Sequence, residues 1–212
     1  MLSSGRCASK KISIGVTLYV LMSRFIKVGK SKGNGGQRKI TLKEQRRQKA
    51  EKKKKGKNWS QDSPPESDIK NLIELFHQGG TEIIEASALK LAGNYPRHPF
   101  AWKVLGLVFD RTGRENQALE AHHKAVELDP KDAESHNNLG IALKESKNLR
   151  EAEKSFRRSI KLAPGYAQAH NNLAVVLQLL GNFEQAASSC KEAIALMPDY
   201  HEAYLNLSKP IE

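Results

Sequence analysis

The strongest constraint on the fold is a spacing of 34 residues that several residue types share in one register. Prolines, leucines, alanines and glycines all follow it, and Lys147 takes the one glycine slot that is not filled by glycine. A fixed period of this length is typical of arrays in which each unit is one small supersecondary structure. The members of the register are Pro96, Pro130, Pro164 and Pro198; Leu105, Leu139, Leu173 and Leu207; Ala118, Ala152 and Ala186; and Gly79, Gly113 and Gly181.

The unit over residues 99–132 illustrates what the register encodes. Its first half predicts a helix over 100–112, because Trp102, Leu105 and Phe109 are three and four residues apart and so share one face. Gly113 ends this helix, since glycine accepts the left-handed backbone that a helix exit often needs.

The second half of the unit predicts a helix over 115–128 that packs back on the first. Gly106 and Ala118 are small, which allows the two helices to approach closely, and Pro130 stops the second helix. One such hairpin cannot bury its apolar face, whereas three or more stacked hairpins bury a continuous core. We therefore expect an all-α fold, a right-handed superhelical solenoid of antiparallel helix pairs with an inner groove lined by the first helices.

The spacing of large and small residues resembles the tetratricopeptide repeat consensus. In that consensus a large aromatic residue stands on the second helix, where this chain has His122 in one unit and Cys190 in another, and we expect looser packing there. The matching residues are Trp102, Leu105, Gly106, Phe109, Ala118, Ala125 and Pro130; then His136, Leu139, Gly140, Leu143, Ala152, Phe156, Ser159 and Pro164; then His170, Leu173, Ala174, Leu177, Ala186, Cys190, Ala193 and Pro198.

The register also sets the domain boundaries. Full repeats are expected at 99–132, 133–166 and 167–200, with a degenerate repeat or N-terminal cap at 65–98. Residues 201–212 begin another first helix and then reach Pro210, so they read as a truncated repeat. Either the chain is a fragment of a longer repeat protein or its last unit is covered by dimerisation, and we expect the fragment.

Residues 1–60 differ in character from the rest. They hold 18 Lys and Arg residues and only two acids, Glu44 and Glu51, for a net charge of +16, while the remainder is mildly acidic. A segment with so little apolar content cannot offset the entropy of ordering, so we expect disorder. The run Lys52, Lys53, Lys54 and Lys55 belongs either to a solvated tail or to a tether for an anionic partner, nucleic acid or membrane.

An apolar run over residues 12–22 precedes this basic stretch. It is shorter than the roughly 20 residues that a membrane-spanning helix requires. Either translation begins at Met22, or the run is a weak export or membrane-surface signal, or it is part of a disordered tail. Cys7 and Cys190 suggest no disulfide framework, and we expect a cytoplasmic protein, with the nucleus as an alternative in a eukaryote.

A row of asparagines recurs on the predicted first helices. Asn138, Asn172 and Asn206 are one repeat apart, and Asn137 and Asn171 precede two of them. A row of amides along a groove can bond an extended peptide backbone whatever its side chains. Around residues 169–174 the sequence is similar to the superhelical arm of O-linked N-acetylglucosamine transferases, a resemblance that implies substrate peptides held by such asparagines. The alternative is that the amides continue the helix surface or bond the neighbouring repeat.

Candidate catalytic and metal-binding residues form no constellation in the sequence. His136 and His170 occupy the slot of a large side chain, which favours packing over metal binding. The glycine cluster at 33–36 follows no predicted strand and is a poor phosphate loop. We expect a non-enzymatic scaffold that binds a protein or peptide in its groove and needs no cofactor or small-molecule substrate. The alternatives are the recruiting arm of a glycosyl- or sulfotransferase, or a tether acting through the basic tail.

Overall fold

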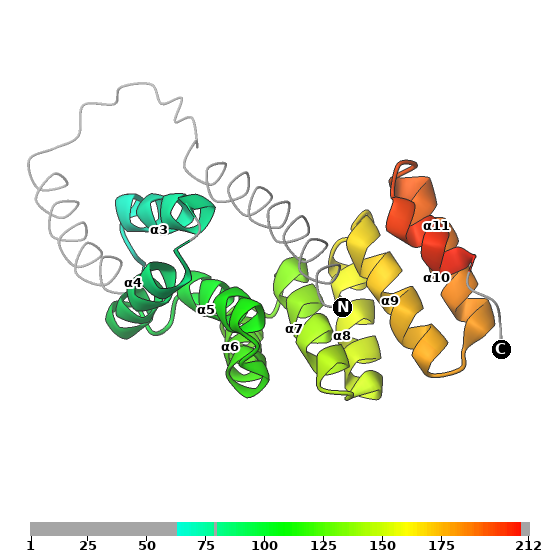
Figure 1. Cartoon of the computed structure of the whole chain (residues 1–212), viewed down its shortest axis with the longest axis horizontal. Helices are drawn as coiled ribbons and strands as arrows, with labels where there is room; N and C mark the ends of the chain where they lie inside the picture. Colours follow the sequence, from blue (N-terminus) through cyan, green and yellow to red (C-terminus); the bar gives the residue numbers. More distant parts are fainter. Residues whose placement is uncertain (1–62, 79, 209–212) are drawn as a thin grey trace, which may run out of the picture. The chain divides into compact units, whose positions relative to one another are not determined.

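A computed structural model describes residues 63–78 and 80–208, in which the regular secondary structure is helical (Figure 1). The basic run Lys52 to Lys55, the apolar run over 12–22 and Cys7 lie outside this part, so the predictions made for them stay predictions. The chain divides after His98 into two compact units. Every helix in the described residues is too short or too polar to cross a membrane.

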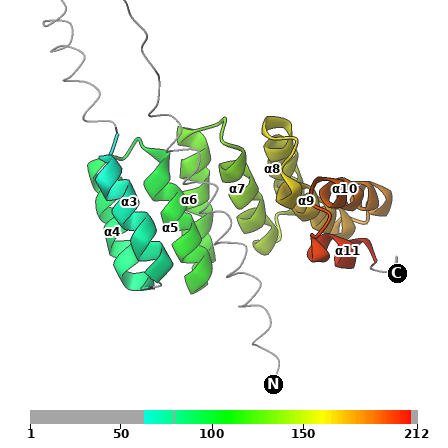
Figure 2. The same ribbon diagram turned by 90° about the horizontal axis from the view of Figure 1, so that it is seen from above.

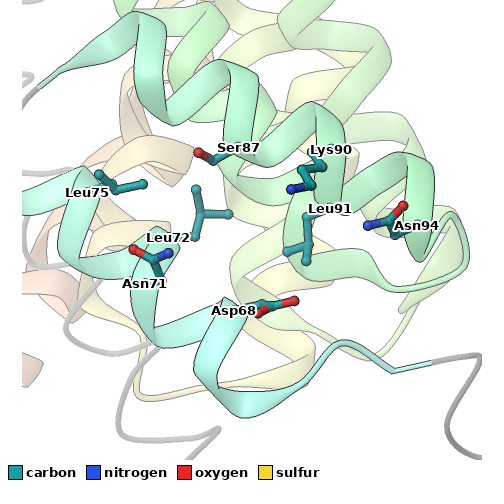
Figure 3. Close-up of a pocket in the computed structure, with 8 residues that line it drawn as sticks. All are labelled: Asp68, Asn71, Leu72, Leu75, Ser87, Lys90, Leu91 and Asn94. Atoms are coloured by element: carbon teal, nitrogen blue, oxygen red, sulfur yellow. The ribbon is translucent and has the colours of Figure 1, made fainter.

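The described residues of the first unit form a pair of helices, α3 (Glu66–Gln78) and α4 (Thr81–Asn94), that pack on each other. Their buried side chains are aliphatic and aromatic, among them Leu72 and Phe76 from α3 and Ile84 from α4. A pocket of about 160 Å³ lies between the two helices, with Leu72 and Leu91 inside and polar groups such as Asp68 and Lys90 around it (Figure 3). The stretch predicted to be a degenerate repeat or an N-terminal cap thus forms a helix pair, and the choice between the two stays a prediction.

The second unit is a succession of helix pairs (Figure 1; Figure 2). Each first helix packs on the second helix of its own pair, and each second helix packs on the first helix that follows it. The pairs are α5 (Pro99–Thr112) with α6 (Glu115–Leu128), α7 (Ala133–Glu145) with α8 (Leu149–Leu162), and α9 (Ala167–Leu179) with α10 (Phe183–Leu196), followed by α11 (His201–Leu207). The predicted arrangement of antiparallel helix pairs is confirmed.

The turn between the two helices of a pair has one geometry throughout this unit. The backbone is left-handed at Gly113 (φ 73°), Lys147 (φ 61°) and Gly181 (φ 78°). At each turn the next amide N–H bonds a carbonyl five residues earlier, as from Arg114 to Phe109 at 3.0 Å. This bond satisfies a carbonyl that the end of the helix would leave free, which explains why glycine or a tolerant substitute recurs there.

The close approach of the paired helices depends on small residues, as predicted. The expected looser packing is not found at His122, and at Cys190 it stays a prediction. A Cβ added to Gly106 would lie 2.3 Å from the His122 ring. Both His122 and Cys190 are fully buried. In the third pair Ala174 stands in the glycine slot, so the smaller Cys190 is matched by a larger neighbour.

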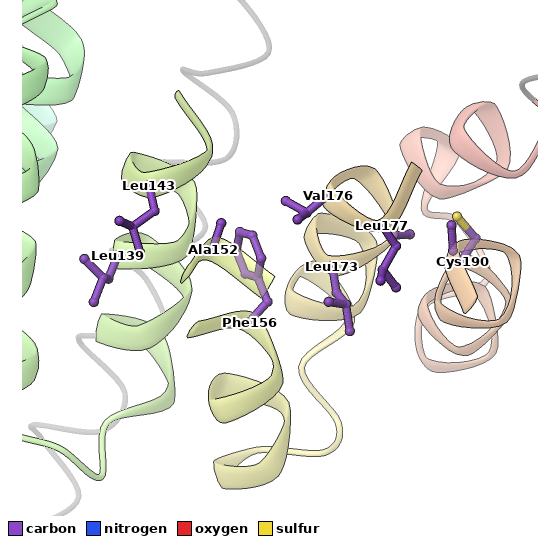
Figure 4. Close-up of a cluster of buried hydrophobic side chains, with 10 residues drawn as sticks. Leu139, Leu143, Ala152, Phe156, Leu173, Val176, Leu177 and Cys190 are labelled. Atoms are coloured by element: carbon purple, nitrogen blue, oxygen red, sulfur yellow. The ribbon is translucent and has the colours of Figure 1, made fainter. Parts of the chain in front are cut away.

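The core of the second unit is continuous from one pair to the next. Phe156 of α8 lies between Leu139 and Leu143 of α7 and the α9 side chains, which Figure 4 shows side by side. Cys190 extends this cluster onto α10 as a buried free thiol. Burial that runs across pair boundaries is what holds a repeat array together, because no single pair has a core of its own.

Candidate functional site

Successive first helices of the second unit meet along one face, which we call the first-helix face and define by α7, α9 and α11. Two asparagine pairs join these helices. Asn172 Nδ2 donates to Asn137 Oδ1 at 3.0 Å, and Asn206 Nδ2 donates to Asn171 Oδ1 at 2.9 Å. The two bonds repeat one geometry at a spacing of one repeat, so they set the register between neighbouring first helices.

These contacts place most of the predicted groove residues inside the joints between helices. Asn137, Asn138, Asn171 and Asn206 are all buried, and only Asn172 is half-buried. The bonding of a neighbouring repeat, which the sequence left as an alternative, accounts for four of the five amides. Asn172 is the member of the row that solvent reaches while it also takes part in a bond between repeats.

Asn138 has no such partner. By the spacing of the other two pairs its partner position is Lys103, and the Asn138 Nδ2 makes no hydrogen bond within the described residues. Lys103 Nζ instead donates to Asp132 Oδ2 at 2.8 Å and to Glu134 Oε2 at 3.1 Å. Val104 stands where the next repeats have Asn138 and Asn172, and Lys103 replaces the amide bond with an ion-pair cluster.

The Lys103 cluster joins the first helix of one pair to the start of the next. All three side chains are buried or nearly so. Asp132 also caps α7, since it accepts hydrogen bonds from the Ser135 amide at 3.0 Å and the Ser135 hydroxyl at 2.6 Å. Burial raises the pKa of Asp132, but the charge of Lys103 and the hydrogen bonds from Lys103 and Ser135 lower it more, so the net pKa lies below its usual value. We did not predict this cluster from the sequence. The signal for it is that Lys103 stands where the next two repeats have Asn137 and Asn171.

The accessible part of the first-helix face lies mainly on α9. Gln168, Asn172, Val175 and Leu179 are four, three and four residues apart and therefore share one side of the helix. The first three are half-buried and Leu179 is 59% exposed. This set, which we call the α9 row, combines two amides with two aliphatic side chains in contact with solvent.

The far end of the face is fixed by Tyr200 and Gln178. Asn171 Nδ2 donates to the Tyr200 hydroxyl at 3.3 Å, and Gln178 Nε2 donates to the backbone carbonyl of Asn206 at 2.6 Å. Burial raises the pKa of Tyr200 to about 12, with the nearby Glu202 adding to the shift. These contacts hold α11 against α9, so the accessible row sits on a braced surface.

The two candidate histidines have equivalent structural roles. His136 Nε2 donates to the Pro130 carbonyl at 3.1 Å, and His170 Nε2 donates to the Pro164 carbonyl at 3.0 Å. Each bond ties a first helix to the turn that precedes it. In the part of the chain that the structure describes, no three His, Cys, Asp or Glu side chains come together as a metal site would require.

Comparison with known families identifies these helix pairs. Models described as tetratricopeptide repeats match residues 133–166 and 167–200, and a further repeat model matches residues 106–147. Residues 106–200 are tetratricopeptide repeats. The matches run from the second half of α5 to the end of α10, and residues 63–105 lie outside them. A search of the curated proteins found no match.

Solved structures of several repeat proteins are similar to this chain. A structure of MamA has a TM-score of 0.60 at 24% identity, covering 64% of this chain and 80% of that one. A structure of pilF from Pseudomonas aeruginosa has a TM-score of 0.62 at 23% identity, covering 66% and 64%. The first tetratricopeptide repeat domain of Spaghetti (RPAP3), bound to an HSP90 peptide, has a TM-score of 0.51 at 21% identity, covering 52% and 88%. These likenesses show the fold, and their diversity does not single out the glycosyltransferase arm.

Proposed function

We propose that the repeats form a protein-interaction scaffold that binds an extended segment of another protein along the first-helix face. The main support for this proposal is the α9 row, in which Asn172, Val175 and Leu179 are accessible to solvent. The asparagine pairs hold α9 to α7 on one side and to α11 on the other. A braced surface loses little conformational entropy on binding, which favours affinity.

The chemistry of the α9 row suits a peptide backbone with apolar side chains. The bond to Asn137 uses one hydrogen of the Asn172 Nδ2, which leaves a second hydrogen and the Oδ1 for a ligand's carbonyl and amide. Leu179 and Val175 supply apolar contact beside this amide. An exposed leucine that a ligand covers contributes about 1.5–3 kcal/mol. One amide and two aliphatic groups at helical spacing therefore favour a short extended segment over a small polar molecule.

Two likenesses support a peptide as the ligand. One similar structure is a repeat domain bound to an HSP90 peptide. The sequence around residues 169–174 resembles the arm of O-linked N-acetylglucosamine transferases, a family whose inner asparagines hold substrate peptides. In this chain the buried Asn137, Asn171 and Asn206 form hydrogen bonds between neighbouring repeats. We therefore assign the ligand contact to Asn172, Val175 and Leu179.

The experiment selects ligands from a displayed library of random peptides with the full chain and then measures affinity for Leu179→Asp. We expect a loss of about tenfold or more, because a charge would replace an apolar contact. The matched control is Leu196→Asp, since Leu196 on α10 is also exposed (43%) but belongs to a second helix. Equal affinity for the two variants, with unchanged circular dichroism, would refute the proposed binding face.

A further inference from the structure

A row of cations runs along the outer side of α8. The members are four, four and three residues apart, so by helical geometry they share one side over a length of about 17 Å. The spacing places them opposite the buried Phe156. We call this set the α8 stripe, and it consists of Arg150, Lys154, Arg158 and Lys161.

These four side chains are exposed and form no ion pair with any described residue. Arg157, next to the stripe, shows the contrast, because it bonds Glu153 Oε1 at 2.8 Å and Gln185 Oε1 at 2.8 Å. The other second helices of this unit are not basic, since α6 and α10 each carry more acids than lysines. Like charges at this spacing weaken a helix by a few tenths of a kcal/mol per pair, a cost that an anionic partner removes.

Beside the stripe lies a pocket of about 350 Å³ formed by α8, α9 and α10. Ile160 and Leu173 give it an apolar part. Its polar lining has two cations and one carboxylate, together with an imidazole and two hydroxyl groups: Arg157, Lys161, Glu192, His170, Ser188 and Ser189. Arg157 bonds Gln185 across α8 and α10, which fixes the separation of the two helices at the pocket. The site therefore offers one apolar contact next to a line of positive charge.

We propose that the α8 stripe and this pocket form a second docking surface for an acidic protein segment that carries one apolar anchor residue. The stripe matches a run of carboxylates, and the pocket takes the anchor. This surface lies on second helices and is separate from the first-helix face.

Other anionic partners fit these observations less well. Sequence-tolerant binding of single-stranded nucleic acid relies on aromatic stacking, and the aromatic residue of α8, Phe156, is buried. A helix lying on a membrane presents large apolar residues beside its cations, and α8 has none among the exposed large hydrophobic residues of the described part. An acidic protein segment uses both the charge and the adjoining apolar pocket.

The test uses the full chain and a labelled peptide of Asp and Glu residues around one central leucine. Because the basic N-terminal residues also attract acids, a photoreactive group replaces the central leucine in a second copy of the peptide, and mass spectrometry locates the crosslinks. We expect crosslinks on residues 157–161 or 188–192. Crosslinks confined to residues 1–62 or to the first helices would overturn the proposal.

Affinity provides the second readout. The variant Arg150→Glu, Lys154→Glu, Arg158→Glu should weaken peptide binding by about tenfold at low salt. The control variant Lys90→Glu, Arg97→Glu, Lys131→Glu changes the net charge equally at exposed cations elsewhere and should bind almost as the parent chain does. Equal losses in both variants would contradict the proposal.

Two further probes separate the partner classes. Replacing the central leucine of the peptide by alanine should weaken binding severalfold through the loss of pocket contact. A DNA oligonucleotide or anionic lipid vesicles that bind through the stripe more tightly than the acidic peptide would overturn the assignment to a protein partner.

Discussion

At the scale of single residues, Lys147 holds a backbone conformation that its equivalents reach with glycine. Its φ is 61°, beside 73° for Gly113 and 78° for Gly181. A residue with a side chain is destabilised by about 1–2 kcal/mol in this conformation. Glycine avoids this cost but loses more conformational entropy on folding, so the net gain from glycine is smaller. We predict that Lys147→Gly raises the free energy of unfolding by about 0.5–1 kcal/mol in urea denaturation. Gly113→Ala should lower it, and a stabilising effect there would contradict the explanation.

The glycine and aromatic pairs within each repeat also act at this scale. A Cβ added to Gly140 would lie 2.6 Å from the Phe156 ring, which is fully buried and cannot move aside. Gly140→Ala should therefore cost about 1–3 kcal/mol. In a Phe156→Cys background, which copies the Ala174 and Cys190 pair, the same change should cost nothing or stabilise. A urea-denaturation cycle measures the coupling, and additive effects would show that the two positions do not share this space.

At the scale of elements, the Asn137–Asn172 bond joins α7 to α9. Asn172→Ala leaves the buried Asn137 carbonyl without its donor and should cost about 1–3 kcal/mol. Asn137→Ala leaves the half-buried Asn172 open to water and should cost less. The double variant should cost less than the sum of the two, while Asn116→Ala on the exposed side of α6 should change stability by less than about 0.5 kcal/mol. Equal costs at the two positions would contradict the assigned burial.

The Lys103 cluster makes the joint between α5 and α7 sensitive to acid. The pKa of Asp132 lies below its usual value of 3.8, so its stabilisation is present above that pH and is lost as the pH falls through the lowered pKa. We predict that Asp132→Asn, which keeps a cap for α7, costs about 1–3 kcal/mol at neutral pH and less in acid. Thermal unfolding across the acid range measures this. A stability difference that does not shrink in acid would contradict the charge pairing.

Comparison of the sequence with the structure shows which elements were predictable. The helix pairs were predictable from the 34-residue spacing, and the close contact at Gly106 was predictable from the small size of that residue. The packing at His122 was mispredicted, since the sequence alone does not show how closely its ring lies against Gly106. The burial of Asn138 and Asn171 escaped prediction for a similar reason, because a one-dimensional pattern does not tell an exposed amide from one in a joint between helices.

At the scale of the whole molecule, the second unit is an array whose neighbouring repeats are joined by a shared core and by the asparagine pairs. The array presents two separate surfaces, the first-helix face around Asn172 and the α8 stripe on the second helices. Tests on one surface need not disturb the other, because Leu179 and Lys154 lie on different helices and are both exposed. A ligand for the first-helix face is thus expected to leave the stripe free.

The most direct test of the binding face is a methyl NMR titration of the full chain with a peptide selected as above. We predict that the methyl signals of Val175 and Leu179 shift most as the peptide is added, together with that of Ile141, which is half-buried on α7 one repeat before Val175. The signals of Ile160 and Leu196, on the second helices, should stay in place. Shifts confined to Ile160 and Leu196, or spread evenly over all methyl groups, would contradict binding at the first-helix face.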